Sequence, residues 1–583
     1  MSLIKTNDAK CRDCYKCVRH CPVKAISIKS NEDESQVHVK VLDESCIHDG
    51  LCTLICPQKA KVVVSSLEEV KELLNSKSGR VVASVAPSFP AAIPLDEPSL
   101  FPALLKHLGF SYVGQTAVGA EMIALEHRLA NALGPVISSA CPVVVNLVEQ
   151  YYPHLIPYLS PLVSPMIAHG RLLKTQFPGC TVVFIGPCIA KIGEAMSEEV
   201  KGAVDYVLGF NEVWGWIKQA NIDLKEISKI DFDGYTPGPA RLFPVEGGQL
   251  LASYMSTNII DRDVQAVSGL DNCTELFKNF SATTMDKRPN FMELLACSGG
   301  CLGGPNVAST DDVYLKRIKL MDYYSYDGQW EQQLNQKMDK PSMPANLLHR
   351  KYRDRKVNLP IPDEEQIKDI LAMSDKFEPG DELNCSACGF DTCREKAVAV
   401  FQGKAEPQMC IPFMRKRAES LSDMVLHALS DGVIIVGEDL TIQAINPAAK
   451  KIFDCTSGII GQKLDKLIDP SEFVRVFKEM TIINSSICYL SNKMVTRQII
   501  FPLGNRAVGI FTDITAELRK QKELQLVKTQ TIQRAQEVIK KQMTVAQVIA
   551  GLLGETTAET KVQLNQLINL MKEDGVDKEE RKE

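Results

Sequence analysis

The cysteine pattern constrains this chain more than any other feature. Of its 583 residues, 19 are cysteine, and most of them stand in short, regularly spaced groups. In a cytoplasmic chain the thiols stay reduced, so grouped cysteines there are metal ligands rather than disulfides. We therefore expect a cytoplasmic protein with several metal centres along its length.

Composition excludes some other classes of protein. The hydrophobic content of 45% and the charged content of 24% are ordinary for a folded, soluble chain. A net charge of −6 gives no strong field toward nucleic acid or an anionic membrane. We see no secretory leader and no apolar run of about 20 residues, so we expect no nucleic-acid or membrane partner.

Shifts in composition divide the chain into segments. Long apolar runs begin at Val81, Thr181 and Phe291, and each ends in Pro or Gly, which is typical of buried strands that lead into loops. The fold class is therefore multidomain, with α/β and α+β parts. The expected segments are a cysteine-rich domain at 1–60, a connector with a strand and a helix at 61–80, an α/β domain at 81–346, a linker with one helix at 347–380, a small cysteine-rich domain at 381–415, a sheet domain at 416–516 and a helical tail at 517–583.

The first segment repeats one cysteine frame. The spacing C-x2-C-x2-C-x3-C before a proline wraps three thiolates around one cubane and sends the fourth to a second cluster. The second copy carries Asp49 where a cysteine is expected, beside Gly50. Asp49 is either an oxygen ligand, a mark of a labile iron corner as in a [3Fe-4S] cluster, or part of a turn. The expected sets are Cys11, Cys14, Cys17 and Cys56 for one cluster, and Cys21, Cys46, Cys52 and Asp49 for the other.

This segment resembles the bacterial two-cluster ferredoxins over about 50 residues. The resemblance implies a ferredoxin-like domain with two [4Fe-4S]-type clusters. A zinc site is the alternative, although seven cysteines fit the ferredoxin frame.

Three further cysteine motifs lie in the α/β segment: SSACPVV, IGPCIAKIGE and ELLACSGGCLGGPN. Four thiolates from three separate loops can hold one cubane between two half-domains. The paired glycines, Gly299-Gly300 and Gly303-Gly304, allow backbone to approach a cluster closely. Together the motifs resemble the catalytic domain of the [FeFe]-hydrogenases over about residues 81–345.

That resemblance implies an H-cluster, a [4Fe-4S] cubane joined through one cysteine to a diiron subcluster. Cys301 would form the bridge, and Lys191 would face a cyanide ligand as a paired buried charge, unless it is a surface lysine. In the family the proton-accepting base belongs to the cofactor, so the protein supplies ligands, polarity and an electron path. The cubane ligands would be Cys141, Cys188, Cys297 and Cys301.

Departures from the family matter for turnover. Ala140 stands where family enzymes have a cysteine that relays protons, and a methyl group cannot carry a proton. Glu126 and Ser160 match the family's further relay positions, although each is also an ordinary helix or turn residue. Gly186, Leu295 and Val144 replace two methionines and a tryptophan. We expect slow turnover, which suits the sensory subgroup of this family, whose members carry a PAS domain and the same Cys-to-Ala change.

A third cysteine group lies near residue 400. Its spacing C-x2-C-x4-C-x16-C resembles a small [4Fe-4S] domain also found in corrinoid and CO-metabolism proteins, and zinc is the alternative. We expect this cluster to lie between the catalytic domain and the next module. Its ligands would be Cys385, Cys388, Cys393 and Cys410.

Residues 416–516 resemble a PAS domain. The run DGVIIVGEDLTIQAINPAAKKIF predicts two strands and a helix that opens at Asn446-Pro447, and two late strands complete the sheet. No particular PAS ligand follows. Cys455 and Cys488 fit core positions better than ligand positions.

The tail predicts C-terminal helices. Leu524, Val538, Val545 and Leu552, with Thr531 between them, recur at intervals of seven, and the intervening seam positions are mixed. This pattern favours a weak coiled coil of a homodimer or a helix packed on the PAS sheet. Thr556 and Glu559 predict the start of a last helix. No kinase, phosphatase or DNA-binding motif follows, so a separate kinase or phosphatase would receive the signal.

These inferences lead to one functional hypothesis. The chain would be a sensory [FeFe]-hydrogenase of an anaerobe, with low activity, that exchanges electrons between H2 or protons and a ferredoxin-like carrier. The alternative is a non-catalytic iron–sulfur redox sensor that lacks the diiron site. Loss of both methionines and the tryptophan favours this alternative, whereas Lys191 and Cys301 oppose it.

Overall fold

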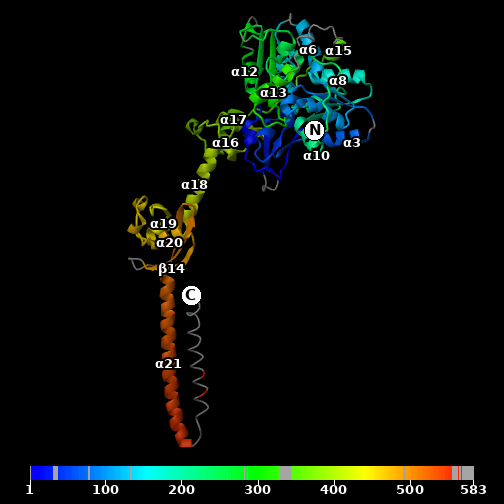
Figure 1. The fold of residues 1–583 in the computed structure, drawn as a ribbon. Coiled ribbons are helices and arrows are strands. Elements are labelled where there is room, and N and C mark those ends of the chain that lie inside the picture. Colours follow the sequence, from blue (N-terminus) through cyan, green and yellow to red (C-terminus); the bar gives the residue numbers. More distant parts are fainter. Residues whose placement is uncertain are drawn as a thin grey trace. The chain divides into compact units, whose positions relative to one another are not determined.

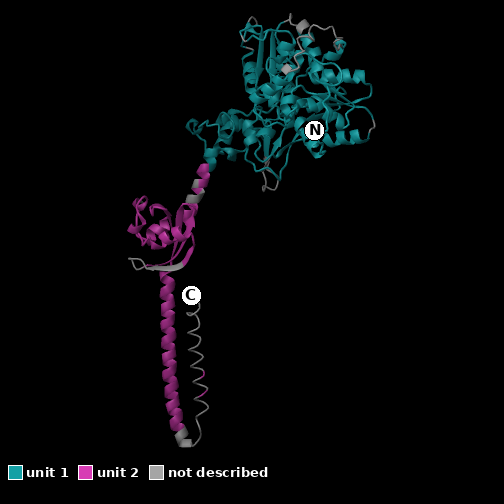
Figure 2. Ribbon diagram, in the orientation of Figure 1, with its two compact units in different colours: residues 1–414 teal, residues 415–583 magenta. Residues whose placement is uncertain are grey.

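The computed structural model describes residues 2–30, 37–76, 79–130, 134–258, 260–280, 282–284, 287–326, 343–489 and 494–553, with Val562 and Gln566. These residues form two compact units, residues 1–414 and 415–583 (Figure 2). The last predicted helix, from Thr556, lies outside the described residues. Among those residues we find no helix with the length and apolar character needed to cross a bilayer.

The N-terminal module consists of short elements around its cysteines. Strand β4 was expected in a connector, but it pairs antiparallel with β1, with Ile4 opposite Val63, and so completes this module. Strands β2 and β3 form a second antiparallel pair. The elements are β1 (Ile4–Thr6), α1 (Lys16–His20), β2 (Ile26–Ser30), β3 (Val37–Val41), α2 (Leu51–Ile55), β4 (Lys61–Val63) and then α3 (Leu67–Ser76).

The central domain contains parallel strands and helices, as the apolar runs predict for an α/β domain, and its strands form two separate sheets. One has the order β6-β5-β8-β9 and the other β10-β11-β7. Their buried strands carry apolar residues on both faces, because helices cover them (Figure 1). The strands are β5 (Val81–Val85), β6 (Tyr112–Gln115), β7 (Val136–Ile137), β8 (Thr181–Gly186), β9 (Tyr206–Gly209), β10 (Val264–Ser268) and β11 (Phe291–Leu295).

Helices of this domain fill the crossovers between strands. Pro at the first or second position opens α5, α7 and α8, where its missing N–H costs nothing. The helices are α4 (Phe89–Ala92), α5 (Phe101–His107), α6 (Ala117–Ala130), α7 (Pro142–Tyr151), α8 (Pro165–Gln176), α9 (Ala190–Met196), α10 (Phe210–Gln219), α11 (Gly248–Ala252), α12 (Leu270–Phe280), α13 (Val313–Tyr326) and α15 (Ala345–Leu348).

The predicted linker at 347–380 is not a free connection. Its first part is fastened to α7, because the Arg355 guanidinium lies 2.6 Å from the Glu149 carboxylate and Val357 N–H donates to the Gln150 carbonyl. Its one helix, α16 (Glu364–Ala372), instead packs on α17 (Cys393–Phe401) of the next domain. We call residues 348–357 the strap.

The small cysteine-rich domain packs on the N-terminal module. Phe390 and Met409 share one buried apolar cluster with Cys17 and Cys21. We expected the small domain to lie between the catalytic domain and the next module, and its contact with the N-terminal module differs from that expectation. The order along the chain is as expected, but in the fold the domain covers the ferredoxin-type module.

Unit 2 contains a five-stranded antiparallel sheet of order β13-β12-β16-β15-β14. Asn446 opens α19 by accepting from Ala449 N–H at 2.8 Å, as predicted. Cys455 packs partly buried against the core, whereas the Cys488 side chain lies outside the described residues. The elements are α18 (Ile411–Ala428), β12 (Gly432–Gly437), β13 (Ile442–Ile445), α19 (Pro447–Ile452), α20 (Ser471–Glu479), β14 (Ile483–Tyr489), β15 (Val495–Leu503) and β16 (Arg506–Asp513).

A long helix, α21 (Thr515–Leu553), follows the sheet. Of its heptad residues, Leu524, Val538 and Val545 are 55%, 56% and 58% exposed. These side chains therefore do not pack on the sheet of their own chain.

Candidate metal centres

Four cysteines of the central domain line one cavity. Cys141, Cys188, Cys297 and Cys301 surround a space of about 100 Å³ whose other walls are mainly apolar. Three loops bring them there, as the sequence predicts. An iron–sulfur cluster suits this arrangement, because several thiolates meet in a site shielded from water.

The sheets place these cysteines at the ends of their strands. Cys188 lies two residues after β8, Cys297 lies two residues after β11, and Cys141 precedes the first turn of α7. The carboxyl ends of parallel strands are the usual location of ligand sites in α/β folds. The backbone of Cys301 is held by a 2.7 Å hydrogen bond from its N–H to the Pro244 carbonyl.

Burial makes three of these thiols, those of Cys188, Cys297 and Cys301, weaker acids than a free thiol. Desolvation, followed by repulsion from the Cys141 thiolate, raises the pKa values of Cys188 and Cys301 to about 12. Burial and the charge of Cys188 raise the pKa of Cys297 as well. A cationic metal would reverse this effect, because it binds thiolates directly.

The glycines near Cys301 are needed for protein packing. Gly299 and Gly300 adopt left-handed conformations, with φ of 71° and 77°. A Cβ atom on Gly300 would lie 2.1 Å from the Pro244 oxygen, and one on Gly299 would lie 2.1 Å from Val313. Gly300 and Gly304 also line the cavity.

Lys191 lies at the cavity wall and is mostly buried. Its Nζ donates to the Glu194 carboxylate at 2.8 Å and to the Ala140 carbonyl at 3.4 Å. Arg350 from the strap also contacts Glu194, at 3.4 Å. The ammonium is therefore buried rather than at the surface, and its charged partner in the structure is Glu194, whereas the resemblance implies a cyanide ligand as its partner.

Four residues differ from those that the resemblance to the [FeFe]-hydrogenases implies, and they lie in or next to the cavity of the four cysteines. Ala140 and Leu295 line the cavity, whereas Val144 is buried in the neighbouring core. At Gly186, a Cβ atom would lie 2.5 Å from the ring of Phe184, which itself lines the cavity. An aromatic ring thus occupies the space next to Gly186.

Glu126 and Ser160 do not line this cavity. Ser160 is buried, and its hydroxyl lies 3.5 Å from Nε2 of His127. Glu126 is half-buried on α6, one residue before that histidine. The motifs alone do not single out His127, although its place beside Glu126 is a usable signal. Burial lowers the pKa of His127 to about 4.

A second buried polar group was also missed. His169 Nδ1 and the Ser84 hydroxyl are 2.7 Å apart, and Ser84 is 2.7 Å from the Thr116 hydroxyl, which lines the cavity. Burial lowers the pKa of His169 to about 3. Histidine within an apolar helix carries no signal of such a network in sequence.

The cysteines of the N-terminal module form two groups. The Gln58 side chain lies 3.7 Å from the sulfur of Cys14 and 4.0 Å from that of Cys56, which places these two cysteines together. Burial raises the pKa of Cys21 to about 11, and the nearby Asp49 carboxylate adds to this shift. Burial and Asp49 likewise raise the pKa of Cys52. Asp49 therefore faces the second group.

Asp49 occupies the same backbone environment as Cys14. The residues on either side of Cys14, Asp13 and Tyr15, have φ of 45° and 54°. His48 and Gly50 flank Asp49 with φ of 61° and 75°. This repeated geometry fits a ligand position. Burial raises the pKa of Asp49 to about 6.

The third group lines a small cavity in residues 381–412. Cys385, Cys388, Cys393 and Cys410 surround about 20 Å³ together with Lys396. Burial lowers the pKa of Lys396, and the charges of Cys410 and Cys388 oppose this effect. A buried ammonium beside four thiols suits an anionic cluster.

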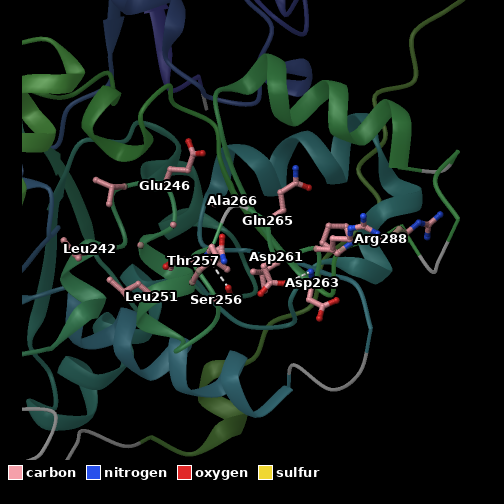
Figure 3. A pocket seen from close by; sticks show the side chains of 18 of the residues that line it. Leu242, Glu246, Leu251, Ser256, Thr257, Asp261, Asp263, Gln265, Ala266 and Arg288 are labelled. Carbon is pink, nitrogen blue, oxygen red and sulfur yellow. Dashed lines mark hydrogen bonds between the residues drawn. The ribbon is translucent and has the colours of Figure 1, made fainter. Parts of the chain in front are cut away.

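A larger pocket lies elsewhere. Figure 3 shows this open space of about 1010 Å³, which is lined by Glu246, Asp261, Asp263 and Arg288 among others and by no cysteine. Arg288 is also engaged with Tyr158, at 3.1 Å. Across the described ranges, no three His, Cys, Asp or Glu side chains are close enough to hold a single metal ion.

Comparison with protein families matches three parts of the chain. Residues 79–305 match the family described as iron only hydrogenase large subunit, C-terminal domain. Residues 10–60 match a 4Fe-4S dicluster domain, and residues 381–412 match a putative Fe-S cluster family. The chain thus combines an iron-only hydrogenase-like domain with a 4Fe-4S ferredoxin-type domain, and iron–sulfur clusters are its expected cofactors.

Curated relatives include hydrogenases and proteins of another kind. Iron hydrogenase 1 of Clostridium pasteurianum is 26% identical over 54% of this chain and 68% of its own length. The NADP-reducing hydrogenase subunit HndD of Solidesulfovibrio fructosivorans is 27% identical over 52% of this chain but only 64% of its own length. The cytosolic Fe-S cluster assembly factor NAR1 of Kluyveromyces lactis is 30% identical over 34% of this chain and 46% of its own length.

Solved structures show weak similarity. An [FeFe]-hydrogenase from Chlamydomonas reinhardtii has 21% identity and a TM-score of 0.41, and covers 50% of this chain and 100% of its own. The PAS domain of nitrogen regulation protein NR(II) from Vibrio parahaemolyticus has 19% identity and a TM-score of 0.15, over 16% of this chain and 98% of its own.

Proposed function

We propose that the chain is a sensory [FeFe]-hydrogenase with low turnover, which reports on H2 or on the cell's electron pool. The observation that carries this proposal is the single cavity lined by four cysteines, with the paired Lys191 ammonium in its wall. Cys141, Cys188, Cys297 and Cys301 would hold the cubane, and Cys301 would also bridge to the diiron site. When bound, this cofactor supplies the open metal position at which H2 is split or formed.

The protein's own part is to hold, shield and charge-balance that cofactor. The apolar walls exclude water, and Lys191 offers a positive charge to an anionic ligand from within the cavity. Ala140 offers no proton-carrying group, and no relay side chain takes its place at that position. Slow proton transfer follows, which fits a sensor better than a metabolic catalyst.

The other modules would connect this centre to partners. The N-terminal sites, with Cys14 exposed at the surface, would exchange electrons with ferredoxin or a similar carrier. Asp49 would be an oxygen ligand of the cluster held by Cys21, Cys46 and Cys52. The antiparallel sheet of unit 2 supports the PAS assignment, and the exposed heptad residues of α21 support a homodimer whose output passes to a kinase or phosphatase.

The second candidate function is a redox sensor without a diiron site. The similarity to the NAR1 assembly factor favours it, as do Gly186, Leu295 and Val144. In this case the cavity would hold a plain cubane.

Infrared spectroscopy of anaerobically matured protein decides between the two candidates. A diiron site shows bands of CO and cyanide stretching, and we expect these bands together with slow H2 evolution. Iron at the four cysteines without such bands would leave only the second candidate.

A further inference from the structure

The small domain contacts the N-terminal module through the loop after Cys388. Lys24 Nζ donates a 2.5 Å hydrogen bond to the Gly389 carbonyl, and the ammonium lies 5.4 Å from the centre of the Phe390 ring. Lys24 itself stands three residues after Cys21. Lys24 thus links the segment that follows Cys21, in the N-terminal module, to the loop that follows Cys388, in the small domain.

The two backbones touch at this contact. Gly389 has φ of 90°, and a Cβ atom there would lie 2.4 Å from the Cα atom of Arg19 in α1. Only glycine allows this approach. Phe390, at 4% exposure, shares a buried cluster with Cys17 and Cys21, and Cys388 packs against that cluster.

The opposite side of the Asp49 site faces the central cavity. A Cβ atom on Gly50 would lie 2.6 Å from Pro305 and 2.7 Å from Ile189. Ile189 follows Cys188, and Pro305 follows Gly304 of the cavity wall. The Ile47 carbonyl accepts from the Asn146 side chain at 3.2 Å, which fixes the same loop to α7.

We infer that the Asp49 site is a branch point for electrons, with the cavity cluster on one side and the small-domain cluster on the other. This inference rests on the proposed iron–sulfur clusters but not on the diiron site. Cys21, Cys46, Asp49 and Cys52 would hold a cluster that, when reduced, would supply one electron to a cluster held by Cys385, Cys388, Cys393 and Cys410. No bond forms or breaks, and no proton moves.

The Lys24–Gly389 contact holds the small domain against the Asp49 site. The signal to unit 2 therefore depends on the ferredoxin-type module, and the small domain does not draw electrons from the cavity directly. Lys24 is a positioning residue, because it holds the Cys388 loop against α1 and touches no reacting atom.

The test uses the full chain with its clusters loaded anaerobically and then reduced with dithionite. In electron paramagnetic resonance, neighbouring reduced clusters broaden one another's signals and shorten their relaxation times. We compare Gly389→Val, whose side chain would strike Arg19, with Gly380→Val at the end of the linker that precedes this domain, where a Cβ atom meets nothing within 4 Å. Lys24→Glu is a second variant, because a carboxylate there repels the Gly389 carbonyl.

We expect magnetic coupling of the small-domain cluster to its neighbour in the wild type and in Gly380→Val. In Gly389→Val and Lys24→Glu we expect this coupling to be lost, while the coupling within the N-terminal module remains and the iron content of the full chain is unchanged. If Gly389→Val fails to retain iron in the small domain, Lys24→Glu decides alone. Unchanged coupling in Lys24→Glu would overturn the branch point. Coupled clusters without infrared bands of CO and cyanide would support the branch point while refuting the hydrogenase function.

Discussion

The N-terminal module and the central cavity hold cysteines in opposite ways. In the module, each copy of one short frame places three ligands within a few residues of one another, the fourth comes from the other copy, and short left-handed turns fix the geometry locally. In the cavity, the ligands come from Cys141 to Cys301, so two sheets must form before they meet. The module can therefore accept Asp49 in one corner, whereas the cavity depends on the packing of the whole domain.

The largest test of this difference replaces one cysteine in each place. Cys301→Ser should abolish H2 turnover and remove the infrared bands of the diiron site, because one sulfur serves both parts of the cofactor. Cys14→Ser should leave those bands in place and slow only the reduction by an external carrier. Infrared spectra and carrier-dependent assays check both. Retained bands in Cys301→Ser would contradict the assignment of the bridge.

Removing the buried charge should have the next largest effect. Lys191→Met leaves the Glu194 carboxylate buried beside Arg350 alone, and we expect about 3 kcal/mol of lost stability. The matched control is Lys201→Met, since Lys201 forms an exposed pair with Glu198 that should contribute less than about 1 kcal/mol. Urea unfolding under anaerobic conditions measures both. Equal effects of the two substitutions would show that Lys191 is not a structural charge of the cavity.

Ala140→Cys tests whether the missing proton carrier at this position makes turnover slow. A thiol at this position can carry a proton, and general acid–base groups contribute roughly 100-fold or more to rates. We expect H2 evolution to rise by about tenfold or more, while Ala140→Ser serves as a control of similar size. An unchanged rate in Ala140→Cys would mean that proton delivery is not the limiting defect.

Buried histidine in the central domain should make its stability depend on pH. Burial lowers the pKa of His169 from 6.5 to about 3. Between these values the unfolded chain binds a proton that the folded chain does not, so stability falls as pH falls. From pH 7.5 to 5.5 the loss from His169 is about 1.4 kcal/mol. Urea unfolding should show a smaller loss in His169→Phe. An identical pH dependence in both proteins would refute this contribution.

The smallest effect is expected in the N-terminal module. Asp49→Cys replaces an oxygen ligand with sulfur in a frame that already suits cysteine, so stability and turnover should change little. Because Asp49 would be the weaker ligand of one iron, we expect the wild type to lose that iron on mild oxidation and to show a three-iron signal, whereas Asp49→Cys keeps the signal of a four-iron cluster. A signal identical to that of the wild type would show that Asp49 does not bind iron.

The short-range features of the fold could be predicted from sequence, and the contacts between segments could not. The cysteine spacings, the apolar strand runs and the Asn446 cap each act within a few residues, and they appear as expected. The pairing of β4 with β1 and the docking of Phe390 on the Cys21 module depend on surfaces formed only after folding. For the same reason, the sequence did not indicate that His127 lies beside Ser160.

The strap has a practical consequence for anyone who wishes to dissect the molecule. A chain shortened at residue 346, where the composition changes, would lose two ion pairs. These are the pairs of Arg355 with Glu149 and of Arg350 with Glu194. The helix that begins beside Cys141 and the wall that carries Lys191 would then both face water. An isolated catalytic piece should extend through Val357 to keep its cofactor.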